Sequence, residues 1–120
     1  DSYEFKGLAI ALKHGDLVLL DYLAITEEAR SYGYGSKTLS FLKEYYKNYR
    51  FFLEIENAED ENAENYEERQ SRKKFYLKNG FSPFPFNVDL FGIEMEILGY
   101  NVLANFQNIL NFTKINLVEL

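Results

Sequence analysis

One strand-to-helix transition in the first half of the chain constrains the fold most. Residues 17–25 (LVLLDYLAI) are almost all apolar, which predicts a central strand that is covered on both faces. A turn containing Gly33 and Gly35 follows, and a helical pattern begins at residue 37. The first turn of a helix has unpaired N–H groups and the positive end of the helix dipole, and glycines let a ligand approach the backbone. The segment therefore predicts an anion-binding site.

Three phosphate-binding motifs compete for residues 30–36 (RSYGYGS). A P-loop needs a Lys–Ser/Thr pair after its last glycine, but residues 35–37 are GSK and the first glycine is missing at the required distance. A dinucleotide fingerprint needs a third glycine at position 38, which is Thr38. The third pattern, Arg/Gln-x-x-Gly-x-Gly/Ala, is matched by residues 30–35. A turn that binds no ligand is the remaining alternative.

The composition excludes several classes of protein. The 120 residues predict one domain, and 47% hydrophobic with 18% aromatic residues exclude disorder. Cys is absent and His14 is the single histidine, so we expect no disulfide, no cysteine nucleophile and no metal site. A net charge of −6 argues against nucleic acid as a partner and is compatible with a cationic substrate. Without a signal peptide or a membrane-length apolar run, we expect a cytoplasmic protein with no membrane partner.

The rest of the chain predicts an α/β fold. Residues 3–12 and 17–25 form an antiparallel hairpin about a polar break, and the helix after the glycine turn ends near Asn48. The further predicted elements, in order, are a strand at 50–56, an acidic loop at 57–68, a helix at 67–79 that Gly80 ends, an extended Pro-containing segment at 82–86, a hairpin of 87–90 and 93–98, a weak helix at 101–111, and a short strand or tail at 115–120.

Carboxylates interrupt two of these strands. Asp21 lies inside the apolar run, and an unpaired buried carboxylate is costly, so it lines a wet cleft, sits where the sheet opens, or is a locally hydrogen-bonded structural residue. In the strand at 50–56, alternation places Glu54 and Glu56 on the same face as Phe52, and Phe51, Leu53 and Ile55 on the other.

A second motif carries a family resemblance. Residues 69–81 (RQSRKKFYLKNGF) contain Tyr76, Gly80 and Phe81 in a Tyr-x-x-x-Gly-Phe pattern at the end of a predicted helix. Together with Arg30-x-x-Gly33-x-Gly35 earlier in the chain, this order resembles the GNAT N-acetyltransferase superfamily over about residues 3–98. The resemblance implies a mixed, mostly antiparallel central sheet flanked by helices. We expect residues 1–98 to form this domain, shortened at its N-terminus, and residues 99–120 a helical extension packed on it.

The resemblance also implies transfer of an acetyl group from acetyl-CoA to a primary amine, which is either a small molecule or a protein or peptide amine. Tyr76 matches the usual general acid, and Glu54 in Leu-Glu-Ile matches the glutamate that some members use as a base, with Asp21 and Glu56 as alternatives. The residues expected to contact coenzyme A are Leu23, Ala24, Ile25, Arg30, Ser31, Tyr32, Gly33, Tyr34, Gly35, Ser36, Arg69 and Tyr76.

Several positions depart from the family pattern. Glu27 stands where many members have Pro, Ser31 where a further Gly is common, Arg69 where many have Asn, and Arg72 where a small residue is common. Members also begin with a strand, two helices and another strand before the first strand here, so we expect a fragment or a shortened variant. A CoA-binding or partner-binding module without turnover, and an unrelated α/β interaction domain, are the alternative functions. A homodimer is an open possibility.

Overall fold

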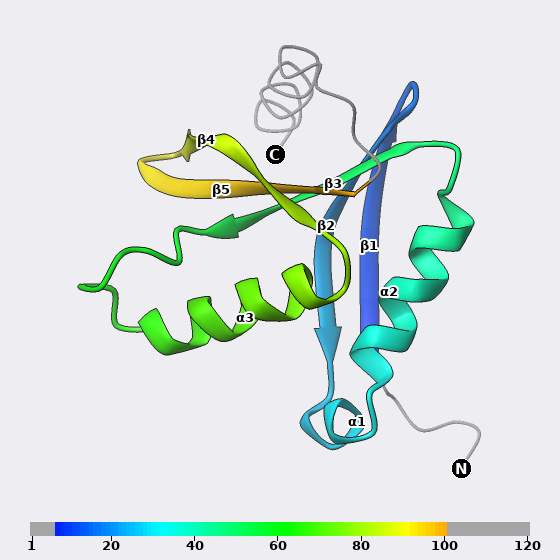
Figure 1. Cartoon of the computed structure of the whole chain (residues 1–120), viewed down its shortest axis with the longest axis horizontal. Helices are drawn as coiled ribbons and strands as arrows, with labels where there is room; N and C mark the ends of the chain where they lie inside the picture. Colours follow the sequence, from blue (N-terminus) through cyan, green and yellow to red (C-terminus); the bar gives the residue numbers. More distant parts are fainter. Residues whose placement is uncertain (1–6, 101–120) are drawn as a thin grey trace.

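The structure is a computed structural model, and it describes residues 7–100. A five-stranded sheet and two main helices make up this part of the chain (Figure 1). The strands are β1 (Gly7–His14), β2 (Leu17–Ile25), β3 (Arg50–Glu56), β4 (Ser82–Leu90) and β5 (Ile93–Tyr100). The helices are α1 (Glu27–Ser31), α2 (Tyr34–Tyr45) and α3 (Tyr66–Lys78). None of these helices is long and apolar enough to cross a membrane.

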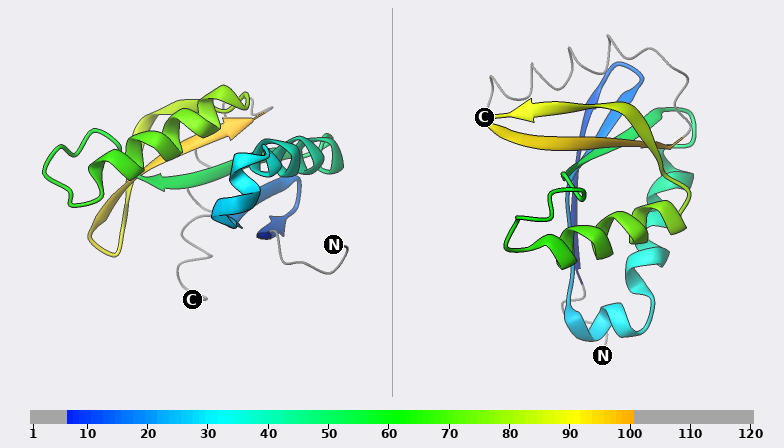
Figure 2. Two further views of the ribbon diagram at one scale, coloured as in Figure 1. Left: turned by 90° about the horizontal axis from the view of Figure 1, so that it is seen from below. Right: turned by 60° about the vertical axis from the view of Figure 1, so that its left-hand side comes forward.

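The sheet is mixed and mostly antiparallel, as predicted. Its strand order is β1-β2-β3-β5-β4, and only the β2–β3 pair is parallel. The helices α2 and α3 both lie on one face of the sheet (Figure 2). The buried side chains on that face include Leu39 of α2 and Tyr76 of α3 with Phe51, Leu53 and Ile55 of β3. The other face carries Phe52 with Leu17, Leu19 and Ile97, so the predicted alternation of β3 is confirmed.

Local sequence signals explain where the elements end. Gly80, which follows α3, has φ +94°. The N–H of Phe81 donates to the Tyr76 carbonyl at 3.1 Å, and the N–H of Gly80 donates to the Leu77 carbonyl at 3.1 Å. This is the Schellman pattern, for which glycine is favoured because it adopts the left-handed conformation without strain. In the turn between β4 and β5, Phe91 and Gly92 both have positive φ, as a two-residue type I′ turn requires. Both predicted stops are confirmed.

Three predictions about the elements need correction. The short helix α1 was not predicted, and α2 begins at Tyr34 rather than after the glycine turn and ends at Tyr45 rather than near Asn48. Strand β4 begins at Ser82 rather than at residue 87, although the Pro-containing segment is extended and lies away from the central strands, as predicted. It tolerates both prolines because it is an edge strand, and Pro85 falls between Pro83 and Asn87, where the register with β5 is irregular. The elements predicted within 101–120 lie outside the described residues.

One buried carboxylate ties the helix α3 and the acidic loop to the sheet. The Glu96 side chain on β5 is buried, and its Oε2 accepts the N–H of Ala58 at 2.7 Å while its Oε1 lies 2.7 Å from Lys73 Nζ. Lys73 belongs to α3, and its pKa is raised by the hydrogen bond to Glu96. Hydrogen bonds to a buried charge are stronger than neutral ones, so this contact fixes the loop and helix over β5.

Glu96→Ala should lower the free energy of unfolding by about 2–3 kcal/mol, because the Ala58 N–H loses its partner and Lys73 keeps only the longer contact to Glu59 at 3.6 Å. Glu94→Ala is the matched control, since Glu94 lies on the same strand and face but is exposed and should change stability by less than about 0.5 kcal/mol. Urea unfolding measures both. Equal losses in the two variants would contradict a special role for Glu96.

Candidate functional site

The neighbouring strands β2 and β3 separate from each other partway along their length. The parallel register joins Leu17–Leu20 to Arg50–Leu53 and then ends, although β2 continues to Ile25 and β3 to Glu56. The register between β1 and β2 shifts at the same level, where Ile10 faces Tyr22 and Ala11 faces Leu20, so Asp21 is an extra residue in β2. A bulge bends its strand, and this one carries the end of β2 away from β3. Asp21 is exposed and sits where the sheet opens, which was one of the three alternatives for it.

The glycine turn closes the same end of β2. Gly33 has φ +77° and caps α2, whose first backbone bond runs from Lys37 N–H to the Gly33 carbonyl at 3.1 Å. The N–H groups of Gly35 and Ser36 lie before that bond, so no carbonyl within α2 can accept them. No atom lies within 4 Å of a Cβ built on Gly33, which leaves open space beside the turn. The first turn of α2 therefore has the free donors and the access that an anion site needs.

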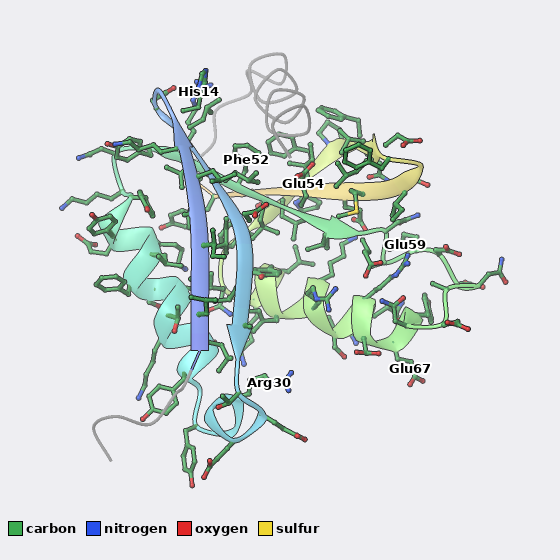
Figure 3. All side chains as sticks on the ribbon, turned by 180° about the vertical axis from the view of Figure 1, so that it is seen from behind. His14, Arg30, Phe52, Glu54, Glu59 and Glu67 are labelled. Atoms are coloured by element: carbon green, nitrogen blue, oxygen red, sulfur yellow. The ribbon has the colours of Figure 1, made fainter. Side chains whose placement is uncertain are left out.

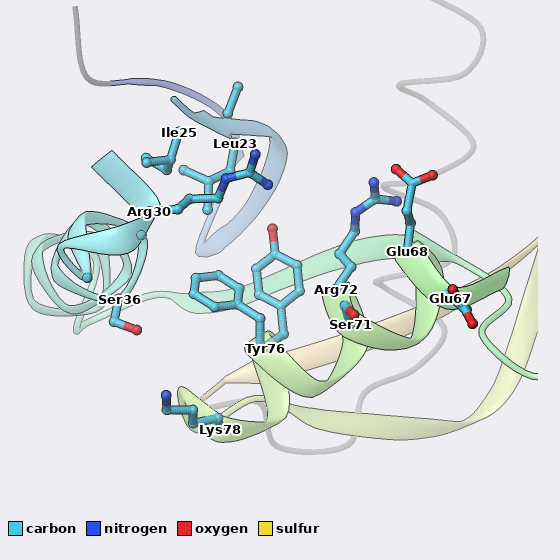
Figure 4. Close-up of a pocket in the computed structure, with 14 residues that line it drawn as sticks. Leu23, Ile25, Arg30, Ser36, Glu67, Glu68, Ser71, Arg72, Tyr76 and Lys78 are labelled. Carbon is cyan, nitrogen blue, oxygen red and sulfur yellow. The ribbon is translucent and has the colours of Figure 1, made fainter. Parts of the chain in front are cut away.

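A groove of about 710 Å³ runs from this turn along α3 (Figure 4). Its lining includes eight residues that the sequence predicted for the cofactor site: Leu23, Ala24, Ile25, Arg30, Gly33, Gly35, Ser36 and Tyr76. Residues from three separated segments, 23–25, 30–36 and 76, therefore meet in one place. The interior of the groove is the part of the described structure that best fits the predicted cofactor.

Other predicted residues lie outside this groove. Tyr32 is exposed, Ser31 ends α1, and Tyr34 lines a separate small pocket between α2 and β1. Arg69 lines a different pocket, and its guanidinium donates to Asn65 Oδ1 at 2.8 Å and to the Asn57 carbonyl at 3.1 Å. With its side chain only 13% exposed and paired to Glu56, Arg69 holds the acidic loop instead of lining the groove.

Six lining residues were not predicted: Glu67, Glu68, Ser71, Arg72, Phe75 and Lys78. All belong to α3. Four of them precede Tyr76 by one, four, five and eight residues, a spacing that places them on one side of a helix: Phe75, Arg72, Ser71 and Glu68. The helical period counted back from Tyr76 was the signal that could have found them.

Tyr76 is buried near the middle of the groove, and burial raises the pKa of its phenol, although the charge of Arg72 acts in the opposite direction. In Figure 4 its hydroxyl is directed toward the end of β2, with the guanidinium groups of Arg30 and Arg72 on either side. A phenol with a raised pKa keeps its proton at neutral pH, so Tyr76 is a hydrogen-bond donor inside the groove.

Glu54 follows directly after Leu53, the last residue of β3 that pairs with β2. Alternation places it on the face of Phe52 (Figure 3), which is the opposite face from that of Tyr76. Burial raises its pKa to about 7, and the nearby charge of Asp21 adds to this effect. Its Oε2 is buried without a hydrogen-bond partner in the described part of the chain. A carboxyl group with this pKa exchanges a proton readily near neutral pH, as a general base requires.

Solved structures with the same fold are GNAT acetyltransferases. A Bacteroides thetaiotaomicron protein assigned to the GNAT family superposes with a TM-score of 0.71 at 19% identity, over 93% of this chain and 64% of that one. A Bacillus subtilis acetyltransferase in complex with CoA gives 0.61 at 17% identity, over 86% and 73%, and nourseothricin acetyltransferase gives 0.64 at 13%, over 83% and 59%. No family model and no curated protein matches the sequence.

The described chain therefore has the GNAT acetyltransferase fold, which confirms the resemblance drawn from the two motifs at the level of the fold. It spans about three fifths of the length of the Bacteroides and nourseothricin enzymes.

The two glycines of the turn should respond differently to substitution. A Cβ at Gly35 would lie 3.1 Å from the Phe75 ring, whereas a Cβ at Gly33 meets nothing and is opposed only by the positive φ. In double-mutant cycles read by urea unfolding, Gly35→Ala should couple to Phe75→Leu, because the smaller side chain relieves the clash. Gly33→Ala should lower the free energy of unfolding by about 1–2 kcal/mol whether or not Phe75 is replaced. Coupling at Gly33, or its absence at Gly35, would contradict this division.

Proposed function

We propose that this protein is an N-acetyltransferase that uses acetyl-CoA as donor and a primary amine as acceptor. The observation that carries the proposal is the groove, which joins the first turn of α2, the diverging end of β2 and the Tyr76 hydroxyl. The acceptor is a small-molecule amine or the amine of a peptide. The proposal is supported by the fold that this chain shares with acetyltransferases, one of which was solved in complex with CoA.

The residues present fit coenzyme A. The Gly35 and Ser36 N–H groups and the Ser36 hydroxyl would bind the pyrophosphate, and the Arg30 and Lys78 cations in the same groove would add attraction for its charge. The backbone of Leu23–Ile25 pairs with β1 but no longer with β3, so the polar groups on its open edge are available to the amides of the pantetheine arm. A backbone N–H of this stretch also suits the thioester oxygen as a hydrogen-bond donor.

Acetyl-CoA would supply the acetyl group: the amine nitrogen attacks the thioester carbon, the C–N bond forms, and the C–S bond breaks with its electron pair leaving on sulfur. The nitrogen then loses its second proton to water or to the Tyr76 oxygen that has given its own proton to sulfur. A lysine-like ammonium has a pKa of about 10.4, so the acceptor must first lose a proton. Glu54 takes that proton directly or through a water molecule, since it stands at the opening between β2 and β3 and is about half ionised at pH 7. Tyr76 donates its proton to the departing sulfur from the groove side.

Acetyl-CoA at 1 mM should raise the melting temperature by several degrees, because ligand at a hundred times its dissociation constant stabilises the native state by about 2.7 kcal/mol. Ser36→Asp should remove the shift, since a carboxylate in the first turn of α2 repels phosphate. Ser40→Asp, an exposed position on the same helix, is the matched control and should keep it. The proposal fails if the wild-type protein shows no shift.

Release of free thiol with a panel of amines tests turnover. Tyr76→Phe should lower kcat about 10- to 100-fold while the shift with acetyl-CoA persists. Glu54 is protonated below its pKa of about 7 and ionised above it, so kcat/KM for the amine should rise through pH 7 in the wild type. Glu54→Gln should remove that inflection. Cofactor binding without thiol release from any amine would favour a binding module without turnover.

A further inference from the structure

Arg72 shares the groove with Tyr76 and precedes it by one turn of α3. Residues four apart on a helix are neighbours on one face, and both side chains line the groove. Figure 4 shows the Arg72 guanidinium beside the Tyr76 ring on the side away from the glycine turn. Arg72 is thus the cation next to Tyr76 along α3, whereas Ser36 and Lys78 lie toward the opposite, phosphate end.

The contacts of Arg72 leave its donors available. Glu56, the nearby carboxylate, already accepts Asn65 Nδ2 at 3.0 Å and Arg69 Nη2 at 3.2 Å, and Arg72 Nη1 lies 3.6 Å from it, too far for a hydrogen bond. Arg69 is fixed by three partners and is nearly buried, but the Arg72 side chain is 45% exposed. Arg69 and Arg72 share the Glu56 carboxylate, and Arg72, which faces the groove, has fewer hydrogen-bond partners among the described residues.

We propose that Arg72 is a second electrostatic group of the reaction, which stabilises the negative charge on the departing sulfur alongside the Tyr76 hydroxyl. The inference rests on the proposed function. As the C–S bond breaks, its electron pair stays on sulfur, and a cation carried by α3 in a partly desolvated groove stabilises that charge more than water does. The same cation already favours the ionised form of Tyr76, which makes the phenol a better donor than burial alone would leave it.

The charges around Arg72 come from several elements. Glu56 of β3 is its partner, Arg30 of α1 faces it across the groove, and Tyr76 and Glu68 lie one turn away on α3. Glu54, which titrates near pH 7, lies on the opposite face of the sheet. Within the loaded groove, the thiol of the ligand is therefore the group whose charge would increase between pH 7 and pH 9.5, and CoA carries it whereas a ligand without the thiol does not.

The test compares CoA with desulfo-CoA, which carries hydrogen in place of the thiol. Calorimetry at pH 7 and pH 9.5 gives the ratio of their dissociation constants, and effects of pH that act on both ligands cancel in the ratio. In the wild type, CoA should gain up to about tenfold over desulfo-CoA at pH 9.5, which corresponds to a thiol pKa lowered by about one unit on binding. Arg72→Gln should abolish this gain, and any effect of the substitution on the affinity for both ligands cancels in the ratio. The variant should still fold, because the exposed Arg72–Glu56 pair contributes little to stability.

Arg72→Lys should keep part of the gain, since it retains the charge without the planar fork. Lys74→Gln removes a cation from an exposed position on α3 that does not line the groove, and should behave as the wild type. A flat ratio in the wild type, or an unchanged gain in Arg72→Gln, would overturn the role of Arg72 while leaving the proposed function in place. If neither ligand binds, the proposed function falls and this inference with it.

Discussion

The site depends on the separation of β2 from β3. Their parallel pairing covers four register positions, after which β2 is held only by β1, and β3 only by β5. Backbone polar groups in a sheet are normally paired, so leaving one edge of each strand open costs free energy that water or a ligand must offset. The bulge at Asp21 produces this opening, and every residue of the candidate site lies along one of its two edges or on the helices that cover it.

Helix α3 determines what the opening can bind. Its C-terminal end is fixed by the Gly80 turn and by Asn79, whose Nδ2 bonds to Ser36 Oγ at 3.2 Å, so the end of α3 is joined directly to the first turn of α2. Its N-terminal half is fixed by Lys73 on Glu96 and by Arg69 on Glu56. With both ends anchored, the face between them is presented in a defined orientation, and Arg72, Phe75 and Tyr76 lie at set positions along the groove.

Local patterns predicted most of the fold and about half of the groove. The apolar run of β2, the glycines of the turn and the Tyr76–Gly80 spacing are readable because each imposes its structure within a few residues. The contacts of Arg69 and Glu96 were not readable, because they depend on which distant element covers a side chain. Glu94 and Glu96 occur on the same face of β5 in an alternating pattern, yet only Glu96 is buried, since Lys73 and Ala58 lie over it alone. A period of two gives the face of a residue, whereas its burial depends on the loop and helix that fold back over it.

The distribution of charge connects the two faces of the sheet. Arg30, Arg72 and Lys78 line the groove on the helix side, although the whole chain carries a net charge of −6. Glu54 is on the opposite face at the mouth of the same opening, close enough to Asp21 for that charge to raise its pKa. In the proposed reaction, the anionic donor would meet the cations on the helix side of the sheet. The cationic acceptor would meet the carboxylates of Glu54 and Asp21 on the other side. Under the proposed function, the two reactants would meet at the level where β2 and β3 separate, so their directions of approach would follow from the sheet.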